Sequence, residues 1–251
     1  MFEMAIFEMV GAPEAGRTFR GERRVRLGDC SPGGRLRLDS TARYLQDLSD
    51  DDTRDAGLEQ MTWVVRRTVI DVAQFPTYLE PLHMVTWCSG VGSRWAERRV
   101  DIDSSGGGSI SSATLWVHID ASTFRPLRPP PAFELVFGPS TMGRAVSSRL
   151  SLSGPPSDLA LAPWPVRFAD FDVMNHVNNA LAFALVEEVL ATRRELRAPF
   201  RVEVEYRSPI ERGVTLSHGG LDGADSYDGW LVDDEGRCYV AFRIGRLRIP
   251  E

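Results

Sequence analysis

The sequence contains the same succession of segments twice, and this repeat constrains the fold more than any other feature. Val25–Asp29 (VRLGD) matches Val166–Asp170 (VRFAD), and each is predicted to be a short strand. After each match come a polar stretch and then a matching segment, Leu38–Asp51 and Asn178–Glu195, and apolar residues of the second segment fall near helical spacing. The repeat continues with matching strand-like segments, namely Pro76–Trp87 with Arg207–His218, and Trp95–Asp103 with Trp230–Ile244.

Each half therefore predicts one strand, one helix and then four strands in meander order. A lone helix beside a sheet of five or six strands can bury its apolar face only by lying across that sheet. This arrangement resembles a hotdog fold, and two such halves would join their sheets as two identical subunits do elsewhere. The prediction is an α+β chain with a tandem (double) hotdog, in which each half is a long helix wrapped by an antiparallel sheet. An unrelated pair of α+β domains is the alternative.

A change in composition near the middle of the chain separates the two copies. RPLRPPPAFELVFGPS begins at Arg125 and SLSGPPSDLALAPWP begins at Ser151, and both stretches are rich in proline. Such composition is typical of linkers and turns. We expect an N-terminal unit at residues 1–130, a linker at 131–162 and a C-terminal unit at 163–251.

Charge and residue usage exclude several classes of protein. The 251 residues carry a formal net charge of -6, which disfavours wholesale binding to nucleic acid. No lysine occurs, so mechanisms that need a Schiff base or a P-loop are excluded. Cys30, Cys88 and Cys238 are too widely spaced for a disulfide framework or a zinc knuckle, and we expect reduced thiols in the cytoplasm. No apolar run approaches the roughly 18 residues that a membrane span needs.

Short polar side chains are concentrated in Asp170–Asn179 (DFDVMNHVNN), just before the second apolar helix. A helix start offers backbone N–H groups without partners inside the helix, and these can hold the developing oxyanion of a thioester carbonyl. Asp172 can attack that carbonyl or deprotonate a water, and His176 can position the reactants or act as general base. A thiol has a pKa of about 8.5, so the thiolate leaves without strong acid assistance.

The repeat distinguishes the two aspartates of this segment. Asp170 has a counterpart in Asp29, so it is interpreted as part of a turn common to both halves. Asp172 has no acidic counterpart, because Ser31 stands at its place. This asymmetry predicts that the second half carries the chemistry. The counterpart of His176 is expected near Arg35, with a small gap in the match.

The same residues allow two other interpretations. Asn178 and Asn179 belong to the residue type preferred at helix N-caps, so they can serve the helix start alone. Asp170, Asp172 and His176 could form a carboxylate-rich metal site, but no second histidine lies near and alternate residues of a strand point in opposite directions. We expect no metal and no other cofactor.

Val166–Phe183 resembles the second hotdog of acyl-acyl-carrier-protein (acyl-ACP) thioesterases, whose pattern is roughly R-W/Y-S-D-x-D-x-N-x-H-V-N-N. Trp63–Trp87 resembles the first hotdog of that family, with its W-x-x-x-R and F/Y-P-T segments. The resemblance covers most of the chain in the right order. It implies a fatty-acyl thioesterase with one active site per chain.

The chain departs from the family pattern at two places. Met174 stands where the pattern has an asparagine, and Asn175 lies one residue away. A methionine there would make the pocket drier and could not hold a water in place. Plant members carry a glutamate where this chain has Pro209. Glu211 lies two residues further on, and the repeat suggests that its counterpart is Glu80, which would make it a turn residue.

The predicted function is hydrolysis of fatty-acyl thioesters of ACP or coenzyme A to free fatty acids. We expect a cytoplasmic monomer or homodimer that binds no nucleic acid and spans no membrane. The first unit would supply the acyl channel and a degenerate site, and the second unit the catalytic motif.

The predicted site consists of catalytic Asp172 and His176, an oxyanion loop of Asn175, Val177, Asn178 and Asn179, and the further candidates Met174 and Glu211. Trp63, Trp87 and Trp95 are candidates for the channel lining, and the favoured alternative is that all three are plain core residues. The alternatives are an enoyl-thioester hydratase of double-hotdog type and a non-catalytic acyl-thioester-binding protein.

Overall fold

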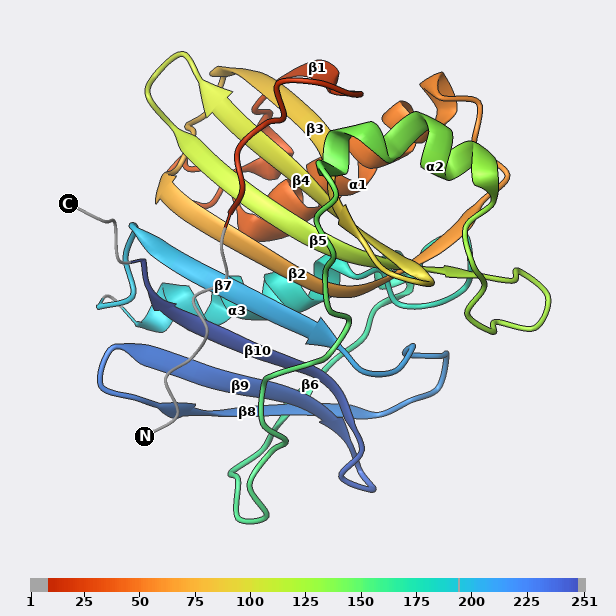
Figure 1. Ribbon diagram of the computed structural model, residues 1–251. Coiled ribbons are helices and arrows are strands. Elements are labelled where there is room, and N and C mark those ends of the chain that lie inside the picture. The colour runs from red at the N-terminus through yellow and green to blue at the C-terminus, as the bar shows by residue number, and fades with distance from the viewer. Residues whose placement is uncertain (1–8, 194, 248–251) are drawn as a thin grey trace.

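The computed structural model describes residues 9–193 and 195–247, and in them one ten-stranded antiparallel sheet dominates the molecule (Figure 1). The strand order is β1-β3-β4-β5-β2-β7-β10-β9-β8-β6. The strands are β1 (Phe19–Arg24), β2 (Thr62–Gln74), β3 (Pro81–Val91), β4 (Trp95–Ser104), β5 (Ser109–Ile119), β6 (Ala162–Trp164), β7 (Phe200–Tyr206), β8 (Leu216–Asp222), β9 (Ser226–Asp233) and β10 (Cys238–Arg246). The α-helices are α1 (Leu38–Asp55), α2 (Pro131–Phe137) and α3 (Ala180–Thr192).

The two halves contribute five strands each in the same order, and they meet where β2 pairs with β7. Outward from this seam the order is β2-β5-β4-β3-β1 on one side and β7-β10-β9-β8-β6 on the other. The expected meander holds for β3, β4 and β5, but β2 pairs with β5 and not with β3. Asp71 and Arg201 face each other across the seam and form a two-pronged ion pair with distances of 2.6 and 2.7 Å.

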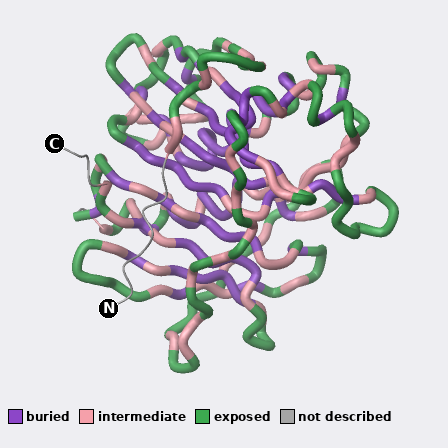
Figure 2. Tube along the Cα trace, viewed as in Figure 1, coloured by how far each residue is buried: buried purple, intermediate pink, exposed green. Residues whose placement is uncertain are grey.

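The long helices α1 and α3 lie next to each other behind the sheet in Figure 1, and they contact each other. On α1 the buried apolar residues Leu38, Ala42, Leu45 and Leu48 recur at helical spacing, so one stripe of the helix faces the core. Most of α3 is apolar and buried, including Phe183, because it lies in the middle of the molecule. Figure 2 shows the buried residues concentrated along the central strands and the exposed residues in the loops. None of the helices in the described residues is long and apolar enough to cross a membrane.

Both copies of the V-R-x-x-D segment differ from the prediction of a short strand. Leu27–Asp29 and Phe168–Asp170 form single 3₁₀ turns, and the strands β1 and β6 end before them. The cause is the aspartate, because its carboxylate accepts a hydrogen bond from the backbone N–H three residues earlier, of Arg26 at 3.1 Å and of Arg167 at 2.7 Å. This local bond competes with strand formation.

The expected linker at 131–162 contains regular structure in its first part. Residues 131–137 form α2, and Pro139–Thr141 form a 3₁₀ turn. Phe133 and Phe137 of α2 are buried in a small hydrophobic cluster with Leu58, Cys88 and Ala96. This part of the segment therefore packs onto the first half.

Candidate active site

The loop before α3 is a tight turn organised by Asp172. The Asp172 N–H donates to the His176 carbonyl at 2.9 Å, and the Asn175 N–H donates to the Asp172 carbonyl at 3.0 Å. The carboxylate oxygen Oδ1 of Asp172 accepts the N–H groups of Met174 at 2.9 Å and His176 at 3.3 Å. Asn175 has a φ of 62°, in the left-handed region that asparagine tolerates better than most residues. The other carboxylate oxygen, Oδ2, accepts no hydrogen bond from the residues that the structure describes.

The start of α3 leaves one backbone donor and one side-chain amide unused. Asn178 serves the helix start, because its Oδ1 accepts the Ala180 N–H at 2.8 Å. The Asn179 carbonyl accepts the Tyr206 hydroxyl at 3.0 Å. The backbone N–H and the side-chain amide of Asn179 have no hydrogen-bond partner within the described part of the chain. The helix start therefore offers the free donor that an oxyanion site needs.

Asp170 is fully engaged in holding the turn. It is buried, and its two oxygens accept hydrogen bonds from the backbone and the guanidinium of Arg167 at 2.7–3.2 Å. Its counterpart Asp29 accepts the Arg26 N–H and the Tyr44 hydroxyl. Both bonds of Asp29 go to Oδ2, whereas both oxygens of Asp170 are engaged, so Asp170 has no carboxylate oxygen left without a partner.

Hydrogen bonds establish which residues of the two loops correspond. The Ser31 N–H donates to the Arg35 carbonyl at 2.8 Å, as that of Asp172 does to His176. The Gly34 N–H donates to Ser31 at 2.9 Å, as that of Asn175 does to Asp172. Ser31 therefore corresponds to Asp172, and Arg35 to His176. The small gap expected before Arg35 does not exist.

The loop before α1 is closed by an ion pair that has no counterpart among the described residues at the loop before α3. Arg35 donates to both carboxylate oxygens of Glu187, on α3, at 2.9 and 2.7 Å. Glu187 also accepts the Leu38 N–H at 2.6 Å, so it caps the start of α1 from the other half. Gln46 follows Leu38 by eight residues, as Glu187 follows Asn179, so Gln46 is the counterpart of Glu187. The Gln46 side chain has no hydrogen-bond partner among the described residues.

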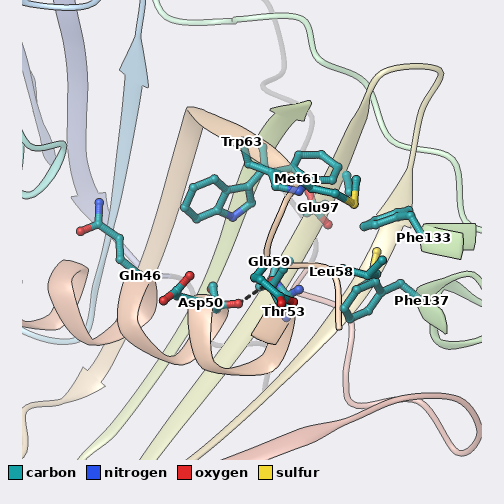
Figure 3. A pocket seen from close by; sticks show the side chains of 15 residues that line it. Gln46, Asp50, Thr53, Leu58, Glu59, Met61, Trp63, Glu97, Phe133 and Phe137 are labelled. Atoms are coloured by element: carbon teal, nitrogen blue, oxygen red, sulfur yellow. Dashed lines mark hydrogen bonds between the residues drawn. The ribbon is translucent and has the colours of Figure 1, made fainter. Parts of the chain in front are cut away.

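A cavity of about 190 Å³ lies in the first half, between α1, the sheet and α2 (Figure 3). A second cavity of about 10 Å³ shares Gln46 and Trp116 with it. A third, of about 30 Å³, shares Asn179 and Tyr206 with the second. Shared walls thus connect the start of α3 with the interior of the first half. The lining of the first cavity is Gln46, Ser49, Asp50, Thr53, Leu58, Glu59, Met61, Trp63, Cys88, Ala96, Glu97, Arg98, Trp116, Phe133 and Phe137.

The predicted catalytic residues line none of the three cavities, but residues that follow them directly in the sequence do. Val177, Asn178 and Asn179 line the third cavity, whereas Asp172 and His176 line none of the three. Both are partly buried. The His176 ring meets the edge of Phe124, from the loop after β5, with ring centroids 6.2 Å apart. The first half therefore contributes a side chain next to the motif of the second.

Two of the predicted supporting residues face away from a closed pocket. Met174 is 44% exposed, so the expectation that it makes the pocket drier is wrong. Its backbone N–H serves the turn, and its side chain lines none of the three cavities. The side-chain oxygen of Asn175 accepts Nε of Arg212 at 2.5 Å. The amide of Asn175 is thus engaged by the loop between β7 and β8.

Glu211 has a different counterpart from the one expected. The Val177 N–H donates to Ile210 as the Leu36 N–H donates to Pro76, so Glu211 corresponds to Thr77 and not to Glu80. The strand register agrees, because Trp164 faces Leu216 as Arg23 faces Leu82. The error is a shift of three residues, since strand patterns alone do not set the register. Glu211 itself is exposed and lines none of the three cavities.

Of the three tryptophans named as candidate lining, one lines the cavity, and most of the other lining residues were not predicted. Trp63 lines the large cavity, but Trp87 is buried elsewhere and Trp95 donates to the Val146 carbonyl at 2.8 Å. Trp116 and Gln46 were not predicted. The signal for Gln46 was available in the repeat, because it occupies the helix position of Glu187. Nothing in the sequence marks Trp116.

Cys88 lines the large cavity, and no other cysteine lines any of the three described cavities. Its thiol is suited to packing and not to nucleophilic attack. Burial raises the pKa of its thiol to about 11, so the thiolate is scarce near neutral pH. All three cysteines are free. In the described ranges, no three His, Cys, Asp or Glu side chains are grouped closely enough to hold a metal ion.

Comparison with known proteins identifies the family. Sequence models of the acyl-ACP thioesterase N-terminal and C-terminal domains match residues 16–133 and 156–227. The chain belongs to the acyl-ACP thioesterase family. It is also 33% identical over 211 residues to an uncharacterised protein of Mycobacterium tuberculosis strain H37Rv, covering 83% of this chain and 84% of the relative.

Solved structures with this fold cover nearly the whole chain. A provisionally named oleoyl thioesterase of Lactobacillus plantarum superposes with a TM-score of 0.77 at 22% identity, over 95% of this chain and 99% of its own. The 12:0-ACP thioesterase of Umbellularia californica gives a TM-score of 0.74 at 21% identity, over 91% and 96%. These similarities establish the α+β hotdog fold, and the family match establishes a thioester hydrolase that acts on fatty-acyl thioesters.

Proposed function

We propose that this acyl-ACP thioesterase is a tandem hotdog whose single active site is the loop Asp172–Asn179 of the second half. Residues 1–130 form the first unit, 131–162 connect the units, and 163–251 form the second. The first unit supplies the acyl channel through the cavity beside α1. The carrier is acyl-carrier protein or coenzyme A.

The difference between the two loops is the observation that supports this proposal. In the loop before α1, the helix-start N–H, Arg35 and Glu187 satisfy one another. At the corresponding places before α3, the Asn179 N–H and Gln46 have no partners among the described residues, and both border one cavity. Unused polar groups beside a cavity are available for a substrate. Only the second loop therefore can take a thioester carbonyl.

In the proposed mechanism, the thioester carbonyl oxygen accepts the Asn179 N–H, which stabilises the oxyanion as the carbonyl carbon is attacked. Asp172 is held by two backbone amides through Oδ1, which leaves Oδ2 to accept a proton from the attacking water or to attack directly. His176 orients the carboxylate or the water. The C–S bond then breaks, and the thiolate leaves and takes up a proton. Attack by water gives the free fatty acid at once, whereas direct attack by Asp172 gives a mixed anhydride that a water then hydrolyses to the fatty acid and the free carboxylate.

A coupled assay tests this function against its two alternatives. The purified chain is mixed with decanoyl-coenzyme A and a chromogenic thiol reagent, and in parallel with crotonyl-coenzyme A. We expect thiol release from decanoyl-coenzyme A and no hydration of crotonyl-coenzyme A. Hydration without thiol release would replace the proposal with an enoyl-thioester hydratase. Tight binding of decanoyl-coenzyme A with neither reaction would replace it with an acyl-thioester-binding protein.

A further inference from the structure

Arg212 contacts the turn that contains Asp172 at both of its ends. Its Nε donates to the side-chain oxygen of Asn175 at 2.5 Å. Its guanidinium carbon lies 4.6 Å from the centroid of the Phe171 ring and 5.4 Å from that of the Phe168 ring. Phe171 directly precedes Asp172, and Asn175 follows it by three residues. One side chain of the connection between β7 and β8 therefore contacts residues on both sides of the proposed catalytic carboxylate.

Asn175 occupies the point of this turn that brings two backbone donors to Asp172. It stands between Met174 and His176, whose N–H groups donate to Oδ1 of Asp172 at 2.9 and 3.3 Å. Its own N–H donates to the Asp172 carbonyl at 3.0 Å. Its φ of 62° lies in the left-handed region, which is unfavourable for most side chains. A contact that holds Asn175 in place therefore also fixes the orientation of the Asp172 carboxylate.

The corresponding turn of the first half is attached in a different way. Gly34 stands at the place of Asn175, with a φ of 82°, and offers no side chain to a partner. Tyr78 stands at the place of Arg212, and its N–H donates to the Gly34 carbonyl at 2.9 Å. Among the described residues, no matching backbone bond joins Arg212 to Asn175. The second turn is therefore attached through a side chain at a place where the first is attached through its backbone.

The contact of Arg212 with the two rings is not needed for the turn to fold. In the first half, Leu27 stands at the place of Phe168. Cys30 stands at the place of Phe171, so that turn has neither ring, yet it makes the same internal backbone hydrogen bonds. Arg212 is exposed and Phe168 is 81% exposed, so their contact buries little apolar surface. The arginine and the rings therefore accompany the acid and not the turn as such.

We propose that Arg212 is a positioning residue for thioester hydrolysis. Its bond to Asn175 keeps the turn closed. The N–H groups of Met174 and His176 then stay on Oδ1 of Asp172, and Oδ2 keeps one orientation toward the reacting atoms. Arg212 acts through the turn in this role and does not touch the substrate. The proposal rests on the active site proposed above and deepens it by naming a residue outside the loop that orients its acid.

The test is a double-mutant cycle between Arg212 and Asn175, measured with decanoyl-coenzyme A. Arg212→Met keeps an apolar stem beside the rings and removes the donor. Asn175→Gly removes the acceptor and introduces the residue that the first half uses at this φ. We expect each variant to lower kcat by about 10-fold and to leave KM within about 2-fold of the wild type, because small misplacements of a reacting group slow the chemical step. The double variant should lose no more than about 2-fold beyond either single variant, because the two residues act as one unit.

Arg125→Met is the matched control, because it removes the same positive charge outside the turn. Arg125 is exposed in the loop after β5, and its side chain has no partner among the described residues. Its kcat and KM should equal those of the wild type. A second measurement is the exchange of the Met174 and His176 amide protons with water, followed by NMR. Exchange should be at least about 5-fold faster in Arg212→Met and unchanged in Arg125→Met.

A higher KM with an unchanged kcat in Arg212→Met would show that the guanidinium binds the carrier, which would overturn the positioning role. Unchanged kinetics, or losses that multiply in the double variant, would overturn it as well. If the wild type hydrolyses no thioester, or if Asp172→Asn keeps its activity, the proposed active site fails. The amide exchange rates then decide the contact on their own, because faster exchange in Arg212→Met supports it and unchanged exchange refutes it.

Discussion

The loop before α1 and the loop before α3 share one backbone conformation and differ in what surrounds it. Both make the same hydrogen bonds, from Ser31 to Arg35 in one and from Asp172 to His176 in the other. In the first loop, the charges of Arg35 and Glu187 close the space beside the helix start. In the second, the counterparts are His176 and Gln46, and the helix start borders a cavity.

The ion pair of Arg35 and Glu187 distinguishes the first loop from the proposed active site in the second. Arg35 and Glu187 come from different halves, so their ion pair and the cap on Leu38 fasten α3 to the start of α1. In the second loop, His176 stands at the place of Arg35, and Gln46 stands at the place of Glu187. The guanidinium and the carboxylate of the first loop are therefore both absent from the start of α3. The Asn179 N–H of the second loop then has no partner among the described residues, which is why it is the proposed donor to a substrate. Substitutions in the two loops should distinguish the stabilising role of the Arg35–Glu187 ion pair from the catalytic role proposed for the second loop.

The largest expected effect is that of Asp172→Asn. The amide oxygen can still accept the N–H groups of Met174 and His176, so the turn and the melting temperature should be preserved. The negative charge and the base are lost, and kcat/KM should fall by about 100- to 10,000-fold. Steady-state kinetics with circular dichroism of the same sample measure both quantities. Retention of more than half of the wild-type kcat/KM would refute the assignment.

Glu187→Ala should reduce stability and leave the chemistry largely unchanged. It leaves the Leu38 N–H and the Arg35 guanidinium without their partner. Because Arg35 is partly exposed, with 28% of its side chain accessible, solvent compensates part of the loss. We expect a decrease of about 1–3 kcal/mol in the free energy of unfolding, measured by urea denaturation. Glu188→Ala, an exposed neighbour on the same helix, is the matched control and should lose much less stability.

Gln46→Ala should show the opposite pattern. Its side chain has no partner among the described residues to lose, so the urea midpoint should change little. Because the amide borders the cavity next to Asn179, kcat/KM should fall by about 10-fold, which corresponds to about 1.4 kcal/mol of transition-state stabilisation. The control is Gln60→Ala, on an exposed turn outside the cavity lining. A variant as active as the control would mean that the counterpart of Glu187 has no role in the reaction.

The order of helices and strands was predictable from the sequence because periodic apolar patterns record which face is buried. The patterns did not give the pairing of β2 with β5 or the register of Glu211, since both depend on contacts between distant segments. The prediction of a strand at Val25–Asp29 was wrong, because the Asp29 carboxylate accepts the backbone N–H of Arg26 and so competes with strand pairing. Phe133 and Phe137 lie in a proline-rich stretch that was interpreted as a linker, yet they pack onto the first half.

The candidate site was partly predictable, because asymmetry within a repeat is visible in the sequence. Ser31 opposite Asp172 pointed to the second half without any structure. Met174 could not be placed from the sequence, because the direction of a side chain in a tight turn follows from the backbone. Gln46 belongs to a polar face of α1 that resembles an ordinary solvent-exposed face. Only the position of α2 and the sheet shows that this face lines a cavity.

The smallest expected effect is that of restoring an acid to the first loop. Ser31→Asp, made in the Asp172→Asn background, places a carboxylate at the position that corresponds to Asp172, on the same turn. If the turn and its acid were sufficient, activity would return. We expect no recovery, because Arg35 and Glu187 occupy the places of the histidine and the glutamine, and Glu187 already holds the Leu38 N–H that an oxyanion would need. Thiol release from decanoyl-coenzyme A measures the outcome, and Ser31→Asn in the same background controls for the added side chain. Recovery beyond this control would show that the Arg35–Glu187 ion pair does not exclude the substrate. The acidic residue would then be the only difference between the two loops that matters for activity.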